Sequence, residues 1–119
     1  MPRPNVNPDQ IDLDPGLLEE WLAEDAAPQV IDVREGYERE AGHIAGTRHI
    51  ELNRLTAEAP TVDRERPVVF YCRVGARSTM AAQAFRASGF DAYSMTGGLR
   101  RWADEGRALV PEGGSVADH

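Results

Sequence analysis

The sequence contains one cysteine, three histidines and no lysine. A single cysteine excludes an intramolecular disulfide and any zinc site that is built from several cysteines. Because His119 is the last residue, only two histidines remain for a metal centre, and we expect neither a metal nor a cofactor. All thirteen basic residues are arginine, and nothing in the sequence explains the missing lysine.

Long apolar segments are also missing. Residues 1–8 lack the apolar core of a secretory signal, and no later segment is long and apolar enough to cross a bilayer. We therefore expect a cytoplasmic protein without a membrane partner, in a reducing compartment that keeps a thiol usable. The formal net charge of −7 argues against nucleic acid as a partner, because nucleic-acid binding needs an excess of cations.

The size of the chain indicates one domain. Its 119 residues suffice for a single core, and 41% hydrophobic with 28% charged content is typical of a globular protein. Proline and asparagine near the start predict an extended arm over residues 1–9. We expect the folded domain over residues 10–110 and a flexible tail over residues 111–119.

Strand-like and helix-like segments alternate along this domain. The expected strands are 11–13, 29–34, 48–51, 67–71 and 90–95. Three expected helices cover 35–40, 53–59 and 78–88, and two more begin at residues 15 and 99. Strands that alternate with helices of this length predict an α/β fold with a parallel sheet covered on both sides.

The strongest functional signal lies between Pro67 and Ser78, where a hydrophobic strand ends at Cys72 and a short loop leads into a helix. Amide groups in the first turn of a helix lack intrahelical partners and carry partial positive charge. A loop entering that turn can aim several amides at one anion. A helix N-terminus with nearby cations also lowers the pKa of a thiol. Cys72 is therefore a candidate nucleophilic thiolate.

The alternative is that Cys72 is only a small apolar core residue. Its neighbours favour a functional site, because Arg73 and Arg77 supply charge and Gly75 supplies a backbone position without a Cβ. Ser78 is expected to be the N-cap of the helix. The candidate binding loop consists of Arg73, Val74, Gly75, Ala76, Arg77 and Ser78.

Three further residues could contribute to the site. Asp32 and Arg34 lie at the end of the strand 29–34, where open α/β sheets place ligand groups. Buried charges need partners, so we favour a supporting role in which they pair with each other or with the loop arginines. His43 could act as a general base, but a histidine between two glycine turns is expected to bond to backbone instead.

Four segments in order resemble one protein family. They are 31–35 (IDVRE), 42–46 (GHIAG), 71–78 (YCRVGARS) and 97–102 (GGLRRW). Together they resemble the single-domain rhodanese-like sulfurtransferases of the thiosulfate sulfurtransferase type. The sequence departs from the usual pattern at Ala45, where proline is common, and at Thr47, where alanine is common.

This resemblance implies a rhodanese-like α/β/α fold of three layers with a five-stranded parallel sheet. It also implies that Cys72 takes a sulfur from a small anionic donor such as thiosulfate and holds it as a persulfide. A thiophilic acceptor then removes the sulfur, and this acceptor is cyanide or a thiol, including a protein thiol. The loop amides would stabilise the persulfide, and Arg73 and Arg77 would hold the sulfonate end of the donor.

Two other functions remain open. The protein could be a persulfide carrier or a sensory module that a partner protein recognises. It could also be a cysteine phosphatase, but such enzymes place five residues between the cysteine and the arginine. Only four residues separate Cys72 from Arg77, and the tighter loop suits a single sulfur better.

Overall fold

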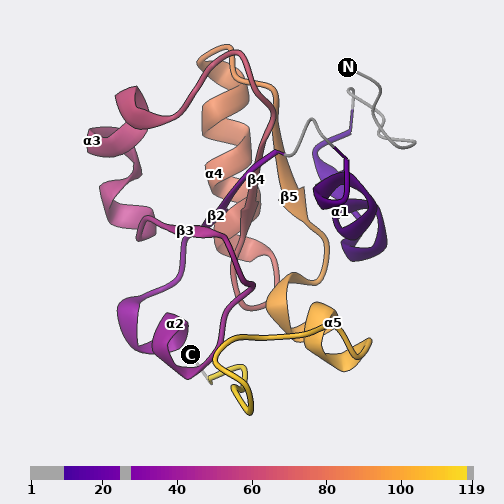
Figure 1. Ribbon diagram of the computed structural model, residues 1–119. Coiled ribbons are helices and arrows are strands. Elements are labelled where there is room, and N and C mark those ends of the chain that lie inside the picture. The colour runs from indigo at the N-terminus through magenta and orange to yellow at the C-terminus, as the bar shows by residue number, and fades with distance from the viewer. Residues whose placement is uncertain (1–9, 25–27, 118–119) are drawn as a thin grey trace.

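The computed structural model describes residues 10–24 and 28–117 (Figure 1). The predicted arm over 1–9 lies outside the described residues. The strands are β1 (Asp12–Leu13), β2 (Gln29–Asp32), β3 (Arg48–His49), β4 (Val68–Tyr71) and β5 (Ala92–Met95). The helices are α1 (Pro15–Leu22), α2 (Gly36–Ala41), α3 (Leu55–Glu58), α4 (Ala76–Ala87) and α5 (Gly98–Asp104), and single 3₁₀ turns, η1 (Leu52–Arg54) and η2 (Ala59–Thr61), flank α3.

All five strands form one parallel sheet in the order β1-β5-β4-β2-β3. This confirms the predicted five-stranded parallel sheet. Strand β4 occupies the centre, and each of its four residues is buried. Its run of β-branched and aromatic residues fits burial on both faces of a parallel sheet. The central strand therefore delivers Cys72 to the carboxyl edge of the sheet, next to the ends of β2 and β5.

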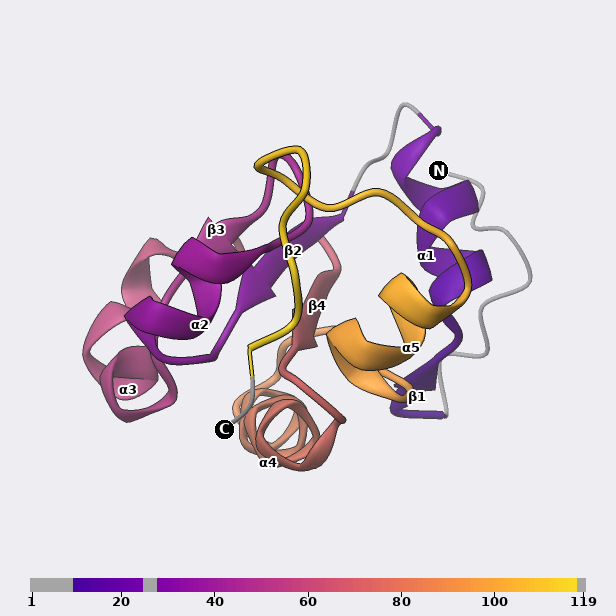
Figure 2. The ribbon, with the colours of Figure 1, turned by 90° about the horizontal axis from the view of Figure 1, so that it is seen from below.

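Helices cover both faces of the sheet, as the three-layer prediction requires (Figure 2). One core cluster joins the sheet to α3 and α4. Within it the rings of Phe70 and Phe85 pack edge to face, with their centroids 4.8 Å apart. The other cluster joins the sheet to α1 and α5. Within it the ring centroids of Trp21 and Tyr93 lie 5.7 Å apart. The cysteine at the end of β4 lies in the first cluster.

Helix α4 differs from its prediction in a way that matters for the site. We expected it to begin at Ser78, but it begins at Ala76, and the N-cap residue is Gly75 with φ of 115°. The prediction of Ser78 as N-cap is therefore wrong. A residue with a Cβ avoids this left-handed backbone, whereas glycine adopts it freely and lets the chain enter the helix two residues earlier.

The C-terminal segment, where we expected a flexible tail from residue 111, contacts the domain as far as Val116. His43 and Val110 exchange backbone hydrogen bonds of 2.9 and 2.8 Å, and the Ser115 amide donates to the carbonyl of Ala41 at 2.8 Å. Val116 packs against the cluster beneath α1 and α5. The segment thereby crosses the end of α2. Within residues 10–24 and 28–117, no helix has the length and apolar character needed to span a membrane.

Candidate active site

The loop between β4 and α4 surrounds the sulfur of Cys72 with hydrogen-bond donors. The residue is 1% exposed, and its Sγ accepts hydrogen bonds from the amides of Gly75 at 3.1 Å and Ser78 at 3.4 Å. The hydroxyl oxygen of Ser78 lies 3.5 Å from the same sulfur. Donors arranged in this way at a helix N-terminus stabilise negative charge on the sulfur.

The N-terminus of α5 holds the backbone of the same loop. The Leu99 amide donates to the carbonyl of Cys72 at 2.8 Å, and the Arg100 amide donates to that of Arg73 at 3.0 Å. At Gly98, where φ is +61°, a Cβ would lie 2.5 Å from the Arg73 carbonyl. The absence of a side chain at Gly98 therefore permits the close approach of α5 to the loop backbone. Helix α5 is therefore a second support for the cysteine loop.

Arg77 forms a two-point ion pair with Glu38 of α2. Its Nη1 and Nη2 atoms donate to the two carboxylate oxygens of Glu38 at 2.8 and 3.0 Å. The Glu38 side chain is completely buried, and it also accepts from the amide of Glu35 at 3.1 Å. The guanidinium that we expected to hold a substrate anion thus already has a protein anion as its partner. Sequence reasoning missed Glu38, because the two residues meet only through the fold.

This ion pair shifts the pKa of both partners. Burial alone raises the pKa of Glu38, but the hydrogen bonds from Arg77 and from the Glu35 amide outweigh burial and hold it below its ordinary value of 4.5. In return, the hydrogen bond to Glu38 raises the pKa of Arg77. Both groups therefore stay charged near neutral pH.

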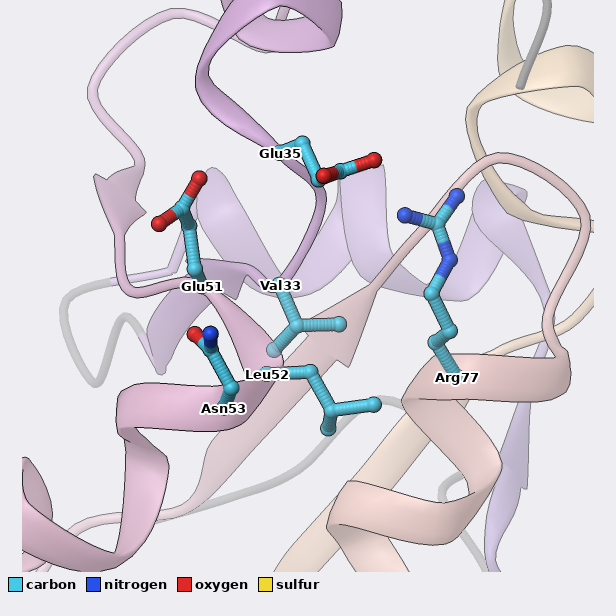
Figure 3. Close-up of a pocket in the computed structure, with 6 residues that line it drawn as sticks. All are labelled: Val33, Glu35, Glu51, Leu52, Asn53 and Arg77. Atoms are coloured by element: carbon cyan, nitrogen blue, oxygen red, sulfur yellow. The ribbon is translucent and has the colours of Figure 1, made fainter.

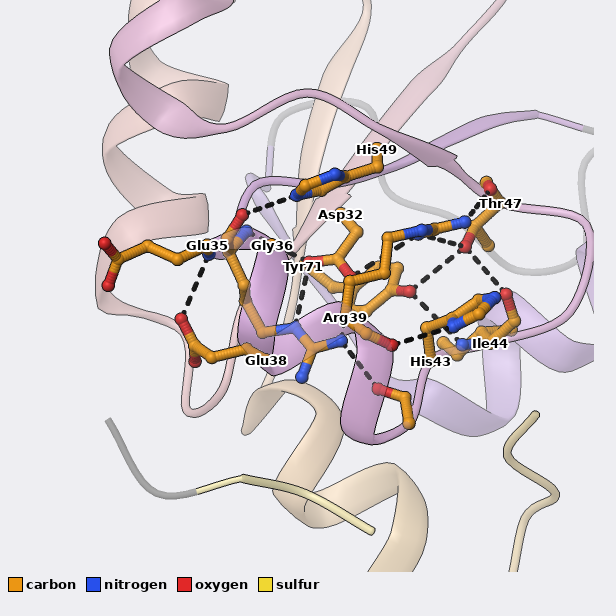
Figure 4. Close-up of polar contacts among 12 residues, drawn as sticks. Asp32, Glu35, Gly36, Glu38, Arg39, His43, Ile44, Thr47, His49 and Tyr71 are labelled. Carbon is orange, nitrogen blue, oxygen red and sulfur yellow. Dashed lines mark hydrogen bonds and ion pairs between the residues drawn. The ribbon is translucent and has the colours of Figure 1, made fainter. Parts of the chain in front are cut away.

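Asp32 and Arg34 pair with each other in the interior, and both side chains are fully buried. Arg34 donates from Nε to Asp32 Oδ1 at 2.9 Å and from Nη2 to Oδ2 at 2.7 Å. The same Nη2 donates to the Gly42 carbonyl at 2.8 Å. Arg39 approaches Asp32 at 3.5 Å (Figure 4). These contacts join the end of β2 to the C-terminal end of α2, and they fit the supporting role that we favour for the pair.

Tyr71 connects this ion pair to the turn before β3. Its hydroxyl accepts from the Ile44 amide at 3.2 Å and lies 3.0 Å from Thr47 Oγ1, while burial raises the pKa of Tyr71 to about 12 (Figure 4). Thr47, one of the two departures from the family pattern, thus takes part in the turn. His43 Nδ1 lies 3.0 Å from the carbonyl of Arg39, in line with the backbone bond that we expected.

The remaining loop residues differ in exposure. Arg73 and Gly75 are half-buried, Ala76 is exposed at the start of α4, and Val74 is 51% exposed. Val74 and Ala76 also line a hollow of about 390 Å³ that reaches Ser94 and Thr79. The loop therefore presents apolar side chains to solvent and turns its polar backbone inward.

A groove of about 350 Å³ lies beside the loop (Figure 3). Arg77 stands on one side of it, facing Glu35 and Glu51 on the other, and apolar side chains lie between them. The lining residues are Val33, Glu35, Glu51, Leu52, Asn53 and Arg77. Only Arg77 was predicted as a site residue. Val33 and Glu35 belong to the segment 31–35 that carries the resemblance but were given no role, and residues 51–53 carry no recognisable signal. Among the described residues, no group of three or more His, Cys, Asp or Glu side chains could hold a metal ion.

Comparison with known proteins agrees with this fold. Residues 14–105 match the family model of the rhodanese-like domain, and the chain therefore belongs to the rhodanese-like family. A rhodanese-related protein from Thermoplasma volcanium superimposes with a TM-score of 0.77 at 27% identity, over 83% of this chain and 96% of that structure.

Two curated relatives are also similar to this chain. The uncharacterized protein YqhL of Bacillus subtilis is 38% identical over 91 residues, which are 76% of this chain and 72% of the relative. The thiosulfate sulfurtransferase GlpE of Pseudomonas paraeruginosa is 38% identical over 91 residues, which are 76% of this chain and 79% of the relative.

The Gly98→Ala substitution tests the support that α5 gives to the loop. The new Cβ would collide with the Arg73 carbonyl, so we expect a loss of about 2 kcal/mol or more in the free energy of unfolding. Gly106→Ala is the matched control, since Gly106 also has positive φ but has no atom within 4 Å of the added Cβ. Urea unfolding of both variants makes the comparison. Equal losses would show that the close contact at Gly98 is unimportant.

The Glu38→Gln substitution tests the ion pair between α2 and α4. Because the pKa of Glu38 is lowered in the folded protein, its carboxylate stabilises the fold above about pH 4.5, and this contribution is lost as the pH falls through the folded-state value. We expect Glu38→Gln to lose about 2 kcal/mol at pH 7 and to show a shallower decline in stability in acid. Urea unfolding between about pH 7 and pH 3 measures this. The exposed Glu40→Gln is the control, and parallel pH curves for wild type and Glu38→Gln would refute the assignment.

Proposed function

We propose that this protein is a sulfurtransferase that moves a sulfane sulfur from thiosulfate or a similar donor to a thiophilic acceptor through a persulfide on Cys72. The observation that carries the proposal is the sulfur of Cys72 under the amides of Gly75 and Ser78. Membership of the rhodanese-like family supports sulfurtransferase activity, and so does the relative named thiosulfate sulfurtransferase.

The reaction proceeds in two displacements. The thiolate of Cys72 attacks the outer sulfur of thiosulfate, a new S–S bond forms, the S–S bond of the donor breaks, and its electron pair leaves with sulfite. An acceptor thiolate or cyanide then attacks the outer sulfur of the persulfide. The electron pair of the broken bond returns to Cys72 as the thiolate, and the acceptor leaves as a persulfide or as thiocyanate.

The loop stabilises the charged sulfur in each step. Two amides and the positive end of α4 face Sγ, where the attacking thiolate forms and where the electron pair returns. An S–S bond lengthens the side chain by about 2 Å, so the transferred sulfur lies beyond the nearly buried Sγ. The groove beside the loop gives an acceptor thiol room to approach.

Arg73 and Arg77 are the cations proposed to hold the sulfonate end of the donor. Arg77 already gives two hydrogen bonds to Glu38, so a donor must share this guanidinium with a protein carboxylate. Its contribution to donor binding is therefore smaller than that of an unpaired arginine. The loop amides carry the larger part of the stabilisation.

A persulfide carrier is the second candidate, and the burial of Cys72 favours it. A residue that is 1% exposed shields Sγ itself, so attack on a persulfide would be limited to its outer sulfur. In this case the acceptor is a partner protein that opens or covers the loop. The phosphatase alternative finds less support, because four residues between Cys72 and Arg77 form too small a ring for a phosphoryl group.

Thiosulfate-to-cyanide turnover by wild type and Cys72→Ser tests the proposal. We expect steady turnover with ping-pong kinetics in wild type and a complete loss in Cys72→Ser, because no other cysteine can hold the sulfur. Mass spectrometry after incubation with thiosulfate should find one extra sulfur on Cys72. Persulfide loading with negligible turnover would identify a carrier. Absence of loading, or hydrolysis of phosphate esters, would overturn the proposal.

A further inference from the structure

A chain of hydroxyl groups runs from the sulfur of Cys72 into strand β5. Ser78 Oγ lies 3.5 Å from Sγ and 2.7 Å from Ser94 Oγ, and Thr79 Oγ1 donates to Ser94 Oγ at 3.3 Å. Ser78 and Ser94 are almost completely buried. Helix α4 and strand β5 lie side by side, which brings the three groups together (Figure 1).

Ser94 is an unusual residue for its position. All four residues of β5 are buried, and the other three are Ala92, Tyr93 and Met95. A hydroxyl in such a strand is costly unless it forms hydrogen bonds, and the partners of Ser94 are both in the first turn of α4. The strand therefore places a polar group directly behind the residue that touches the sulfur.

The number of hydrogens on these hydroxyl groups determines which group donates to which. Each hydroxyl has one hydrogen to donate. Because Thr79 donates to Ser94, the hydrogen of Ser94 is available to Ser78. Ser78 accepts it and keeps its own hydrogen for one of two acceptors, the Gly75 carbonyl at 3.2 Å or the sulfur at 3.5 Å.

The protonation of the sulfur decides between these acceptors. A thiol donates its hydrogen to Ser78 Oγ, and Ser78 then donates to the Gly75 carbonyl. A thiolate has no hydrogen and is the stronger acceptor, so the Ser78 hydroxyl turns toward it. In this second state Thr79, Ser94 and Ser78 all donate in the direction of the sulfur, and each bond strengthens the next.

We propose that Ser94 is a positioning residue for sulfur transfer that acts through Ser78. By donating to Ser78, it leaves the Ser78 hydrogen free to stabilise the anion on Cys72, both before attack on the donor and when the acceptor departs. The inference rests on the proposed function, and it extends the site beyond the cysteine loop to a strand that carries no motif residue. Within the described residues, Ser94 is joined to the sulfur only through Ser78.

The test follows the formation of the thiolate directly. The ultraviolet absorbance of the thiolate is titrated with pH in each variant, and the titration of the same variant carrying Cys72→Ser is subtracted. We expect Ser94→Ala to move the midpoint upward by about half a pH unit, since it removes one neutral hydrogen bond to Ser78. Ser94→Thr, which keeps the hydroxyl, should restore most of the wild-type midpoint.

A second variant guards against misfolding of Ser94→Ala. Thr79 is only half-buried, and Thr79→Val removes the donor that orients Ser94, so we expect a smaller upward shift. Ser88→Ala, an exposed serine at the far end of α4, should leave the midpoint unchanged. The charged neighbours Arg73, Arg77 and Glu38 are unaltered in all these variants. A shift therefore reports on the hydroxyl chain.

The outcomes separate this inference from the proposed function. Titrations of Ser94→Ala and Thr79→Val that coincide with wild type would overturn the role of Ser94, whatever happens to turnover. A shifted midpoint combined with a wild-type protein that never loads sulfur from thiosulfate would instead overturn the proposed function. If Ser94→Ala shifts the midpoint and also loads persulfide about threefold more slowly at neutral pH, both the role of Ser94 and the proposed function are supported.

Discussion

The site depends on two backbone amides that converge on one sulfur. This convergence requires the chain to turn sharply after the central strand, and Gly75 makes that turn in a left-handed conformation that other residues avoid. The turn starts α4 early enough for its first amides and its positive end to face Cys72. The surrounding residues mostly serve to keep this short loop in place.

Three separate contacts hold the loop from different sides. Helix α5 supplies amides to its carbonyl groups, α2 supplies Glu38 to Arg77, and β5 supplies Ser94 to Ser78. Each contact joins segments that are separated in the sequence, and the bond between Ser78 and Ser94 is buried. Displacement of the loop would break hydrogen bonds on several sides at once, which makes one geometry strongly preferred.

The electrostatics of the site are more balanced than the two loop arginines suggest. Arg77 shares its charge with Glu38, and Glu35 and Glu51 stand on the opposite side of the groove. The chain as a whole carries a net charge of −7. In the proposed reaction, an anionic sulfur would therefore be stabilised by local dipoles from amides and hydroxyls rather than by a large positive field. Dipoles of this kind act over short distances, which suits the proposed transfer of a single sulfur atom.

Local patterns in the sequence determined the order of strands and helices, the parallel sheet and the candidate nucleophile. A hydrophobic run, a cysteine and a glycine-containing loop before a helix are neighbours in the chain, so their meaning could be derived without the fold. The start of α4 was misplaced by two residues, because serine is a common N-cap and a glycine in a loop does not by itself show where the helix begins. Only the tertiary structure decided that Glu38 neutralises Arg77, that Ser94 lies behind Ser78 and that the C-terminal segment crosses α2. These pairs are far apart in sequence, and packing alone brings them within hydrogen-bonding distance.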